Sequence, residues 1–400
     1  MIYLDNAATT AVRREVIEAM WPYLTGEYGN PSSIHSLGAQ AARAVAEARE
    51  RVAAVLGCAA GEVIFTSGGT EGDNLAIKGI ALARPRGRHL VTTSIEHGAV
   101  TESCNYLVRH HGFEVTTVGV DRDGRVDAAA MASALRVDTT LVSVMLANNE
   151  VGSIQPVAEI ACAARVVGSR MHTDAVQAAG WLPLSVGESG VGKNCVGEGG
   201  VDALGVDSLG VDSLTLSGHK LGAPKGIGAL YLRRGVRIEA LLHGGGQERG
   251  RRSGTENVAG VVGFAVALEL AAASRRERSI RVTAIRNRFI ARLHAEVPAA
   301  VLIGPAEERL PFNASFCFPG TGGEAVLLEL ERRGIFCSSG SACAAGRDEP
   351  SPVLLAMGYD AELAQTAVRF SLGDGTTPEE LDQTVLAVRD ALAALGALSQ

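Results

Sequence analysis

Short apolar segments alternate with helix-like segments through the first half of this chain, and this pattern limits its possible folds more than any other feature. The expected strands are residues 63–66, 90–93, 115–118, 141–146 and 171–173. The expected helices are residues 38–56, 74–83, 97–110, 128–135 and 157–167. Such alternation predicts a mostly parallel sheet that is covered by helices on both faces. Ligands of these sheets bind beyond the carboxyl ends of the strands.

The chain has 400 residues, which is more than one ordinary domain holds, so we expect two lobes. After a long helical region that runs to about Glu296, the alternation resumes with strands 312–318, 335–337 and 367–372 and helices 323–333 and 378–395. We predict an α/β fold in two parts. The large domain spans 15–256, and a smaller α+β domain is formed by 1–14 together with 257–400.

Charge and composition exclude several classes of function. The net charge of −7 makes direct binding of nucleic acid unexpected. No apolar run approaches the roughly 18 to 20 residues that span a bilayer, and the first residues do not resemble a signal peptide. The seven cysteines are scattered without a CxxC pair, so neither a metal site nor a disulfide framework is expected. We therefore expect a cytoplasmic protein with reduced thiols and no membrane association.

Polar or reactive side chains follow the ends of several expected strands. They are His97, Asn149, Asp174, Gln177, Ser217, His219 and Lys220. Any one of them alone could be an ordinary cap or turn residue. Their repeated occurrence at strand ends favours a shared site.

Lys220 is the most informative of these residues. It stands where the apolar run 214–216 gives way to the turn-rich segment 221–226. Burial at such a place lowers the pKa of a lysine and frees its amine to form a Schiff base. The alternative is a solvated lysine beside a glycine turn.

Two further loops could border a pocket. Ser67–Glu71 joins an expected strand to an expected helix, and its Gly69 and Thr70 could bind an anion through backbone N–H groups and a hydroxyl. The alternative is a plain turn with a threonine cap. The small, polar segment Leu4–Thr10 is either a loop near the pocket or an ordinary N-terminal turn.

Cys343 lies in a stretch of small residues, 338–346. A structural cysteine prefers apolar neighbours, whereas this one has the surroundings of an exposed loop. An exposed thiol can act as a nucleophile.

Residues 185–214 are unusual for a core segment. Gly187–Asn194 nearly matches a phosphate-binding P-loop, but Asn194 replaces the Ser or Thr that binds magnesium, so nucleotide binding is not favoured. A glycine-rich pentad repeat follows, and we interpret the region as a surface insertion. The later loop 243–255 is basic and could reach a phosphate or a carboxylate.

Nine ordered motifs spread over almost the whole chain carry a resemblance to a known family. They are YLDNAATT, YGNPSSIHSLG, TSGGTEGDN, IEHGAV, ANNEVGSIQP, HTDAVQAAG, LSGHKLGAPKG, GGGQERGRRSGTEN and SSGSACAAG. With these motifs the chain resembles the pyridoxal-phosphate-dependent cysteine desulfurases of the NifS/IscS group, in the class V aminotransferase family. The resemblance implies the aspartate-aminotransferase-like fold, also called fold type I of pyridoxal-phosphate enzymes.

The resemblance implies a role for each candidate residue. Lys220 would hold pyridoxal 5'-phosphate covalently, Asp174 would pair with its ring nitrogen, Gln177 would bond its ring hydroxyl, and His97 would stack on the ring and handle protons. The phosphate would be bound by Thr70, Ser217 and His219 beside Gly69, with Thr255 reaching over from the second subunit of a homodimer. Asn149, which also contacts the cofactor, and Arg369 would bind the substrate carboxylate, and Cys343 would take the sulfur.

The implied activity is conversion of L-cysteine to L-alanine with transfer of sulfur to Cys343 and then to an acceptor protein. Iron–sulfur cluster assembly, tRNA thiolation and DNA phosphorothioation are the implied destinations. A selenocysteine lyase or an aminotransferase of the same fold, and a sulfur-relay binding protein without catalysis, are the alternatives. The chain departs from the family pattern at the insertion, residues 185–208, and at Asp374, where many relatives carry a basic residue.

Overall fold

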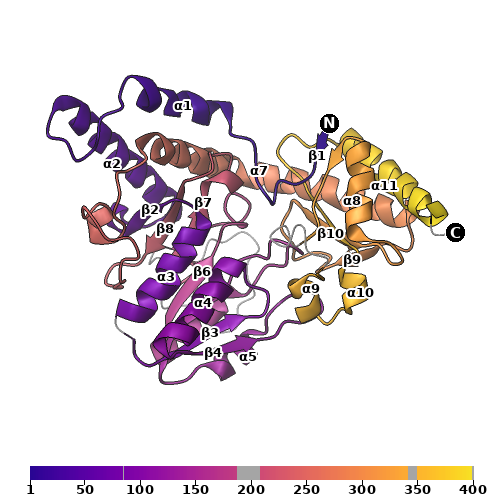
Figure 1. Ribbon diagram of the computed structural model, residues 1–400, viewed down its shortest axis with the longest axis horizontal. Helices are drawn as coiled ribbons and strands as arrows, with labels where there is room; N and C mark the ends of the chain where they lie inside the picture. Colours follow the sequence, from indigo (N-terminus) through magenta and orange to yellow (C-terminus); the bar gives the residue numbers. More distant parts are fainter. Residues whose placement is uncertain (84, 187–207, 341–348, 399–400) are drawn as a thin grey trace.

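A computed structural model describes residues 1–83, 85–186, 208–340 and 349–398 (Figure 1). Most of the predicted insertion, including the near-P-loop segment and much of the pentad repeat, lies outside these described residues, and so does Cys343.

The larger part of the molecule is built on a seven-stranded sheet with the order β2-β8-β7-β6-β5-β3-β4. Its strands are β2 (Val63–Thr66), β3 (His89–Thr93), β4 (Glu114–Val118), β5 (Thr139–Ser143), β6 (Arg170–Asp174), β7 (Ser213–Ser217) and β8 (Gly228–Leu232). Only β8 runs antiparallel to its neighbours β2 and β7, while the other neighbouring pairs are parallel. The prediction of a mostly parallel sheet is confirmed.

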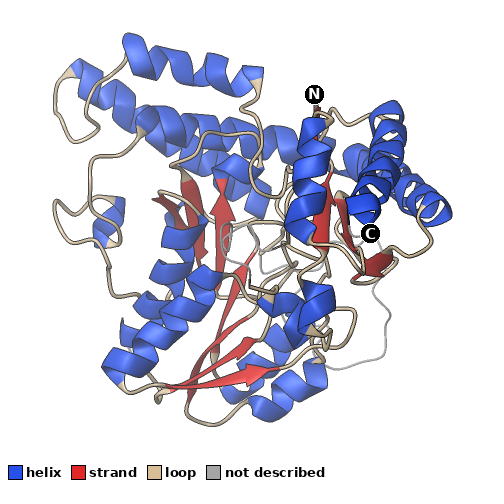
Figure 2. Cartoon of the chain, turned by 45° about the vertical axis from the view of Figure 1, so that its right-hand side comes forward, coloured by secondary structure: helices blue, strands red, loops and turns tan. Residues whose placement is uncertain are grey.

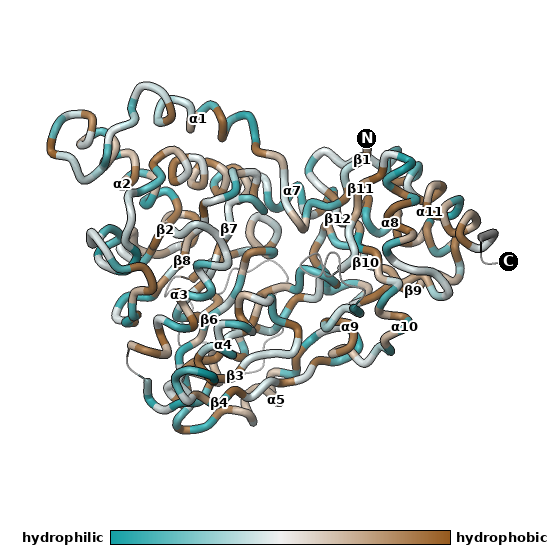
Figure 3. The backbone as a smooth tube through the Cα atoms, viewed as in Figure 1, coloured by the Kyte–Doolittle hydropathy of each residue, from teal (hydrophilic) through white to brown (hydrophobic). Residues whose placement is uncertain are grey.

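Helices cover both faces of this sheet, as Figure 2 shows. They are α2 (Ser36–Leu56), α3 (Gly69–Ala83), α4 (Gly98–His111), α5 (Ala128–Ala134), α6 (Val157–Val167) and α7 (Val258–Glu296). The helix α1 (Arg14–Thr25) packs against α7. Alternate residues of β2 belong to different cores: Ile64 packs with α3 and α4, and Phe65 with α2 and α7. The central strands are buried on both faces but also carry buried polar side chains, such as Thr92 and His172, whereas the edge strand β4 is partly exposed. The hydropathy of the strands can be followed in Figure 3.

The smaller part contains a three-stranded antiparallel sheet with the order β12-β10-β9. Its elements are β9 (Val301–Ile303), β10 (Asn313–Cys317), β11 (Ile335–Phe336), β12 (Ala367–Ser371), α8 (Gly323–Arg332), α9 (Pro352–Ala356), α10 (Ala361–Ala364) and α11 (Pro378–Leu398). The N-terminal strand β1 (Ile2–Tyr3) pairs with β11, so the two ends of the sequence contribute to the same part. The domain boundary at residue 256 remains a prediction, because α7 packs against α1 and α2 and also against α11.

By length and composition alone, α7 would be able to cross a membrane, which the sequence reading did not anticipate. The apolar window of this helix is mostly buried within the described structure, as in the central helix of a folded core.

Several elements differ from the predictions. The expected strand 141–146 leaves the sheet after Ser143, and α3 begins at Gly69 rather than Asn74. The first turn of α3 was not predicted because it contains Gly69 and Gly72, and glycine disfavours helices. Gly72 is needed there, because a Cβ atom would lie 2.7 Å from the Thr215 methyl group on β7. The helix α1 and the strand β8 were not predicted.

Candidate active site

A cavity of about 800 Å³ opens at the carboxyl ends of the parallel strands. Every predicted site residue lines it except Thr255, which lies elsewhere, and Cys343, which is outside the described residues. The lining includes Gly69, Thr70, His97, Asn149, Asp174, Gln177, Ser217, His219, Lys220 and Arg369. The expectation that polar residues at separate strand ends meet in one place is therefore correct.

The N-terminal segment closes one side of this cavity over Lys220. The Nζ atom of Lys220 donates hydrogen bonds to the carbonyl oxygens of Ala7 and Ala8, and Gln177 Nε2 donates to Ala7 at 3.0 Å. The segment Leu4–Thr10 is thus a pocket loop and not an ordinary terminal turn. Lys220 is not a freely solvated lysine, because it lies in the cavity wall.

Asp174 ends β6 as a buried carboxylate in the cavity wall. Its Oδ1 atom accepts a hydrogen bond from Val176 N at 2.9 Å. Burial raises its pKa, while Val176, His97 and Lys220 favour the charged form. Such a carboxylate stays ionised most readily beside a cation.

Asp73 is a second buried carboxyl group in the same wall, and the sequence reading missed it. Its Oδ1 atom has no hydrogen-bond partner among the described residues and lies 3.6 Å from His172 Nε2. Burial and the nearby Asp174 raise its pKa well above the usual range. A buried carboxylate in the cavity wall, such as Asp174, fits the protonated ring nitrogen of a pyridoxal cofactor.

Glu96 is a third buried acid of the cavity. It accepts hydrogen bonds from Thr93 Oγ1 at 2.6 Å and from Met145 N at 3.0 Å. Burial nevertheless raises its pKa to about 8. Glu96 therefore joins the ends of β3 and β5 immediately beside His97.

Another part of the cavity wall suits an anion. Gly69 and Thr70 form the first turn of α3, whose N-terminal N–H groups and dipole favour negative charge. Gly69 approaches the wall closely, since a Cβ atom would lie 2.9 Å from Val176 Cγ2. Burial, followed by Lys220 and Lys225, lowers the pKa of His219 to about 4, so this side chain is neutral at pH 7. These groups fit the phosphate of the cofactor, and the phosphate-binding role of Gly69 and Thr70 remains a prediction.

His97 is held at the N-terminus of α4. Its Nδ1 atom accepts a hydrogen bond from Ala99 N at 3.1 Å and caps the helix. The capping geometry assigns the proton of the neutral ring to Nε2, and the ring lines the cavity.

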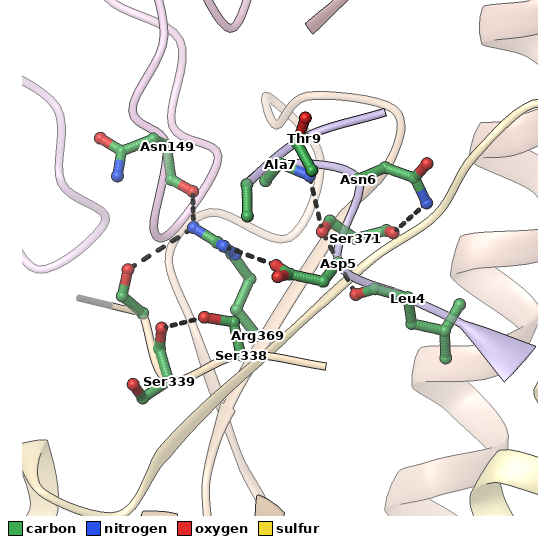
Figure 4. A network of polar contacts seen from close by, with 12 residues as sticks. Leu4, Asp5, Asn6, Ala7, Thr9, Asn149, Ser338, Ser339, Arg369 and Ser371 are labelled. Carbon is green, nitrogen blue, oxygen red and sulfur yellow. Dashed lines mark hydrogen bonds and ion pairs between the residues drawn. The ribbon is translucent and has the colours of Figure 1, made fainter. Parts of the chain in front are cut away.

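Arg369 on β12 is almost fully buried where the small sheet meets the cavity (Figure 4). One terminal nitrogen donates to the carbonyl oxygen of Asn149 at 2.8 Å, and the other pairs with Asp5 Oδ1 at 3.0 Å. Its Nε atom has no hydrogen-bond partner among the described residues. A guanidinium oriented in this way can receive a carboxylate. Asp5 was not predicted, because 364 positions separate it from Arg369 in the sequence.

The model of the family described as "Aminotransferase class-V" matches residues 2–194 and 195–384. The chain belongs to the class-V aminotransferase family. It is 44% identical over 385 residues to a protein from Dictyoglomus turgidum named cysteine desulfurase IscS, a match that covers 96% of this chain and 92% of the relative.

Two solved structures are also similar to this class-V family member. A NifS-like protein superposes with a TM-score of 0.88 at 38% identity, covering 98% of this chain and 100% of that chain. A structure titled SspA in complex with cysteine gives a TM-score of 0.77 at 33% identity, covering 94% of this chain and 100% of that one.

In this class-V chain the loop 243–255 is attached to the helices α2 and α3 by two ion pairs. Arg49 forms a buried two-point pair with Glu248 at 2.6 and 2.7 Å, and Arg252 pairs with Glu71 at 2.8 Å. A carboxylate that this basic loop contacts is the Glu71 side chain of the same chain, which Arg252 binds. Contact with a ligand phosphate or carboxylate remains a prediction. The cross-subunit role of Thr255 remains a prediction.

Asp374, a departure from the pattern of the class-V family, is surrounded by positive charge. It pairs with Arg13 and with Arg278, and Arg281 donates to its backbone carbonyl at 2.6 Å. The acidic residue is thus compensated locally. It does not line the 800 Å³ cavity, but it lines a second cavity of about 340 Å³ whose wall also includes Gln177 and Lys220.

The described cysteines with shifted pKa values are poor nucleophiles. Burial raises the pKa of Cys58 and of Cys104 to about 12 and that of Cys317 to about 11, and it also raises that of Cys337. Since the thiolate is the reactive form, these residues are inert near pH 7.

Proposed function

We propose that this chain is a pyridoxal-phosphate-dependent cysteine desulfurase that converts L-cysteine to L-alanine and retains the sulfur on Cys343. The observation that carries the proposal is the convergence of Lys220, Asp174, His97 and Arg369 on one cavity. The names of the class-V relatives support the same activity.

The cavity offers a place for each part of the cofactor. Lys220 would attach it covalently, Asp174 would pair with its ring nitrogen, and Gln177 would meet its hydroxyl. The start of α3, with Ser217 and His219, would bind the phosphate. The cofactor supplies an electron sink that stabilises negative charge at the substrate α-carbon.

The side chains of the protein would perform the remaining steps. Arg369 would bind the substrate carboxylate through a two-point contact, beside Asn149. The Lys220 amine would also be the base that takes the α-proton of L-cysteine. His97, which carries its proton on Nε2, would exchange protons with the reacting groups in the cavity.

Sulfur transfer needs a thiolate, and Cys343 would supply it. The Cys343 thiolate would attack the substrate sulfur, so that one S–S bond forms while the substrate C–S bond breaks. The bonding electrons of the C–S bond would stay on carbon and take up a proton, which yields L-alanine and a persulfide on Cys343.

Two other activities of the same fold fit less well. An aminotransferase needs no thiol, and a binding protein without catalysis would not need Lys220, Asp174 and His97 in one cavity. A selenocysteine lyase would use the same site. Its preference for selenocysteine over cysteine as substrate would distinguish it from a cysteine desulfurase.

A homodimer is part of the proposal. Large apolar side chains are exposed on one face of α1 and in the loop after it: Ile17, Trp21, Leu24, Tyr28 and Ile34. An exposed apolar surface of this kind is typical of a protein interface, and we assign it to a second copy of the chain. The same assembly would bring Thr255 of one subunit to the phosphate site of the other.

A sulfur-acceptor protein would collect the persulfide sulfur for iron–sulfur cluster assembly, tRNA thiolation or DNA phosphorothioation. We propose a cytoplasmic location, because the chemistry requires a reduced Cys343.

The decisive test is single-turnover release of alanine from L-cysteine together with mass-spectrometric mapping of the persulfide. Cys343→Ser should keep the cofactor and still bind L-cysteine, but it should release no alanine, because a hydroxyl is a far poorer nucleophile toward sulfur. A persulfide first found on Cys195 or Cys337, or near-normal alanine release by Cys343→Ser, would contradict the proposal.

Lys220→Ala tests the cofactor half of the proposal. This variant should lose the visible absorbance of the bound cofactor and all turnover, since no amine remains to attach the cofactor. Borohydride treatment should fix cofactor to the native protein and not to the variant. Covalent, borohydride-reducible cofactor in Lys220→Ala would refute the assignment.

A further inference from the structure

One buried carboxylate in the cavity wall has no role in the proposed chemistry, yet it contacts both ends of the segment that contains Cys343. Ser351 Oγ donates a hydrogen bond of 2.6 Å to Glu150 Oε2. Gly340 packs on the same oxygen, since a Cβ atom there would lie only 2.8 Å from Glu150 Oε2. Gly340 precedes the segment 341–350, and Ser351 follows it.

We infer that Glu150 is a positioning residue that fixes Gly340 and Ser351 to the cavity wall and thereby sets the rate of sulfur transfer to Cys343. The inference rests on the proposed function and adds to it a residue of the cavity wall to which that function assigns no chemical step.

Glu150 is rigidly placed for this role. Its backbone N–H donates to Asn148 Oδ1 at 2.8 Å, and its carbonyl oxygen accepts from Asn313 Nδ2 at 3.1 Å. The residue is 6% exposed. Because its backbone is bonded on both sides, the direction of the carboxylate is set by the fold rather than by solvent.

Ser351 is held just as firmly at the other side of the contact. Its hydroxyl oxygen accepts from Leu354 N at 3.2 Å and caps α9, while the hydroxyl proton goes to Glu150. The start of α9 is therefore oriented by Glu150 through a single hydroxyl group. Loss of either partner leaves a buried polar group unsatisfied.

The contact at Gly340 also reaches the substrate site. The chain before Gly340 is bridged to β12, where Arg369 N donates to the carbonyl oxygen of Ser338. Cys343 follows Gly340 by three residues, a stretch that spans at most about 11 Å when fully extended. Arg369 Nη1 also donates to the carbonyl oxygen of Gly340 at 3.5 Å, so the chain is fixed beside the substrate site at the last described residue before Cys343.

The test compares Glu150→Ala, Glu150→Gln, Ser351→Ala and the double variant of Glu150→Ala and Ser351→Ala, with Glu159→Ala as an exposed control. Two quantities are measured in the cofactor-loaded enzyme. The first is the absorbance change that follows addition of L-cysteine, and the second is single-turnover alanine release with persulfide mapping.

Glu150→Ala should slow alanine release by about tenfold or more while the absorbance change keeps its native rate. Glu150→Gln should recover much of this loss, because its amide oxygen can still accept the Ser351 hydroxyl. The double variant should be no slower than Glu150→Ala, since both changes remove one contact. Glu159→Ala should behave like the native enzyme.

Three outcomes would overturn the inference: native alanine release by Glu150→Ala, additive losses in the double variant, or equal loss of the absorbance change and of alanine release. Failure of the proposed function itself would look different, because the native enzyme would then release no alanine at all.

Discussion

The loop 243–255 and the root of the insertion, which consists of residues 184–186 and 208–209, are two irregular regions that the fold holds in different ways. The loop is fixed by the buried Arg49–Glu248 pair, and Glu248 adopts a left-handed backbone with φ of 49°. At the root, Leu209 N donates to the Ser185 carbonyl oxygen at 2.9 Å, and Leu184 and Val186 are buried in the apolar core.

The difference indicates which region the fold has to hold in one conformation. A buried ion pair and a non-glycine residue in the left-handed region both cost free energy, so they persist only where the surroundings impose them. The root uses only a backbone hydrogen bond and apolar packing. We therefore expect substitutions in the loop to have large effects and removal of the insertion to have little.

Glu248→Ala should show the largest effect. The substitution leaves the Arg49 guanidinium buried without its carboxylate, which typically costs about 3 to 5 kcal/mol of the free energy of unfolding. It also removes the acceptor of Phe65 N on β2. Chemical denaturation of the cofactor-loaded protein measures the loss.

Glu269→Ala is the matched control for this experiment. Glu269 on α7 pairs with Arg51, which lies on α2 like Arg49. This pair is partly exposed and should contribute no more than about 1 kcal/mol. Equal effects of the two substitutions would show that burial does not separate the loop from an ordinary surface contact.

The sequence predicted the parts of this molecule that depend on local pattern. Lys220, Asp174 and His97 could be placed at strand ends because apolar runs mark the strands, and the order of the strands then brings their ends together. The strand β8 was not predicted, because its residues Gly228–Leu232 follow a glycine-rich turn and show no alternation of polar and apolar side chains.

Contacts between distant residues could not be predicted in this way. Glu248 and Arg49 are 199 positions apart, and Ser351 and Glu150 are 201 positions apart. Neither partner carries a local signal of burial, because glutamate, arginine and serine are usually exposed. Only the packed structure shows that these side chains are buried and paired.

Thr255→Ala should have an intermediate effect, on the cofactor rather than on folding. If Thr255 reaches the phosphate of the neighbouring subunit, its loss removes one charge-assisted hydrogen bond, and the cofactor should dissociate about tenfold more readily. Equilibrium dialysis of the cofactor measures the change, and the free energy of unfolding of the cofactor-free protein should stay the same. Unchanged retention of cofactor would show that the rigid loop serves a purpose other than phosphate binding.

Deletion of residues 187–206 should have the smallest effect. Ser185 and Leu209 already meet through a backbone hydrogen bond, so the shortened chain would join them through Val186, Asp207 and Ser208. A three-residue connection lies within the usual range for short loops. Val186 must remain, because it is buried and its N–H donates to the Leu56 carbonyl oxygen at 2.9 Å.

Cofactor absorbance per subunit and sedimentation measure the outcome of this deletion. Both should match the native protein, since the removed segment is rich in glycine and cannot build a core of its own. Val186→Asp is the informative contrast, because it keeps every residue of the insertion but buries an unpaired charge at the root, which should destabilise the fold. The opposite result would be a deletion variant that loses its cofactor or dissociates into monomers while Val186→Asp stays stable. It would show that the insertion itself, and not the residues at its root, stabilises the structure.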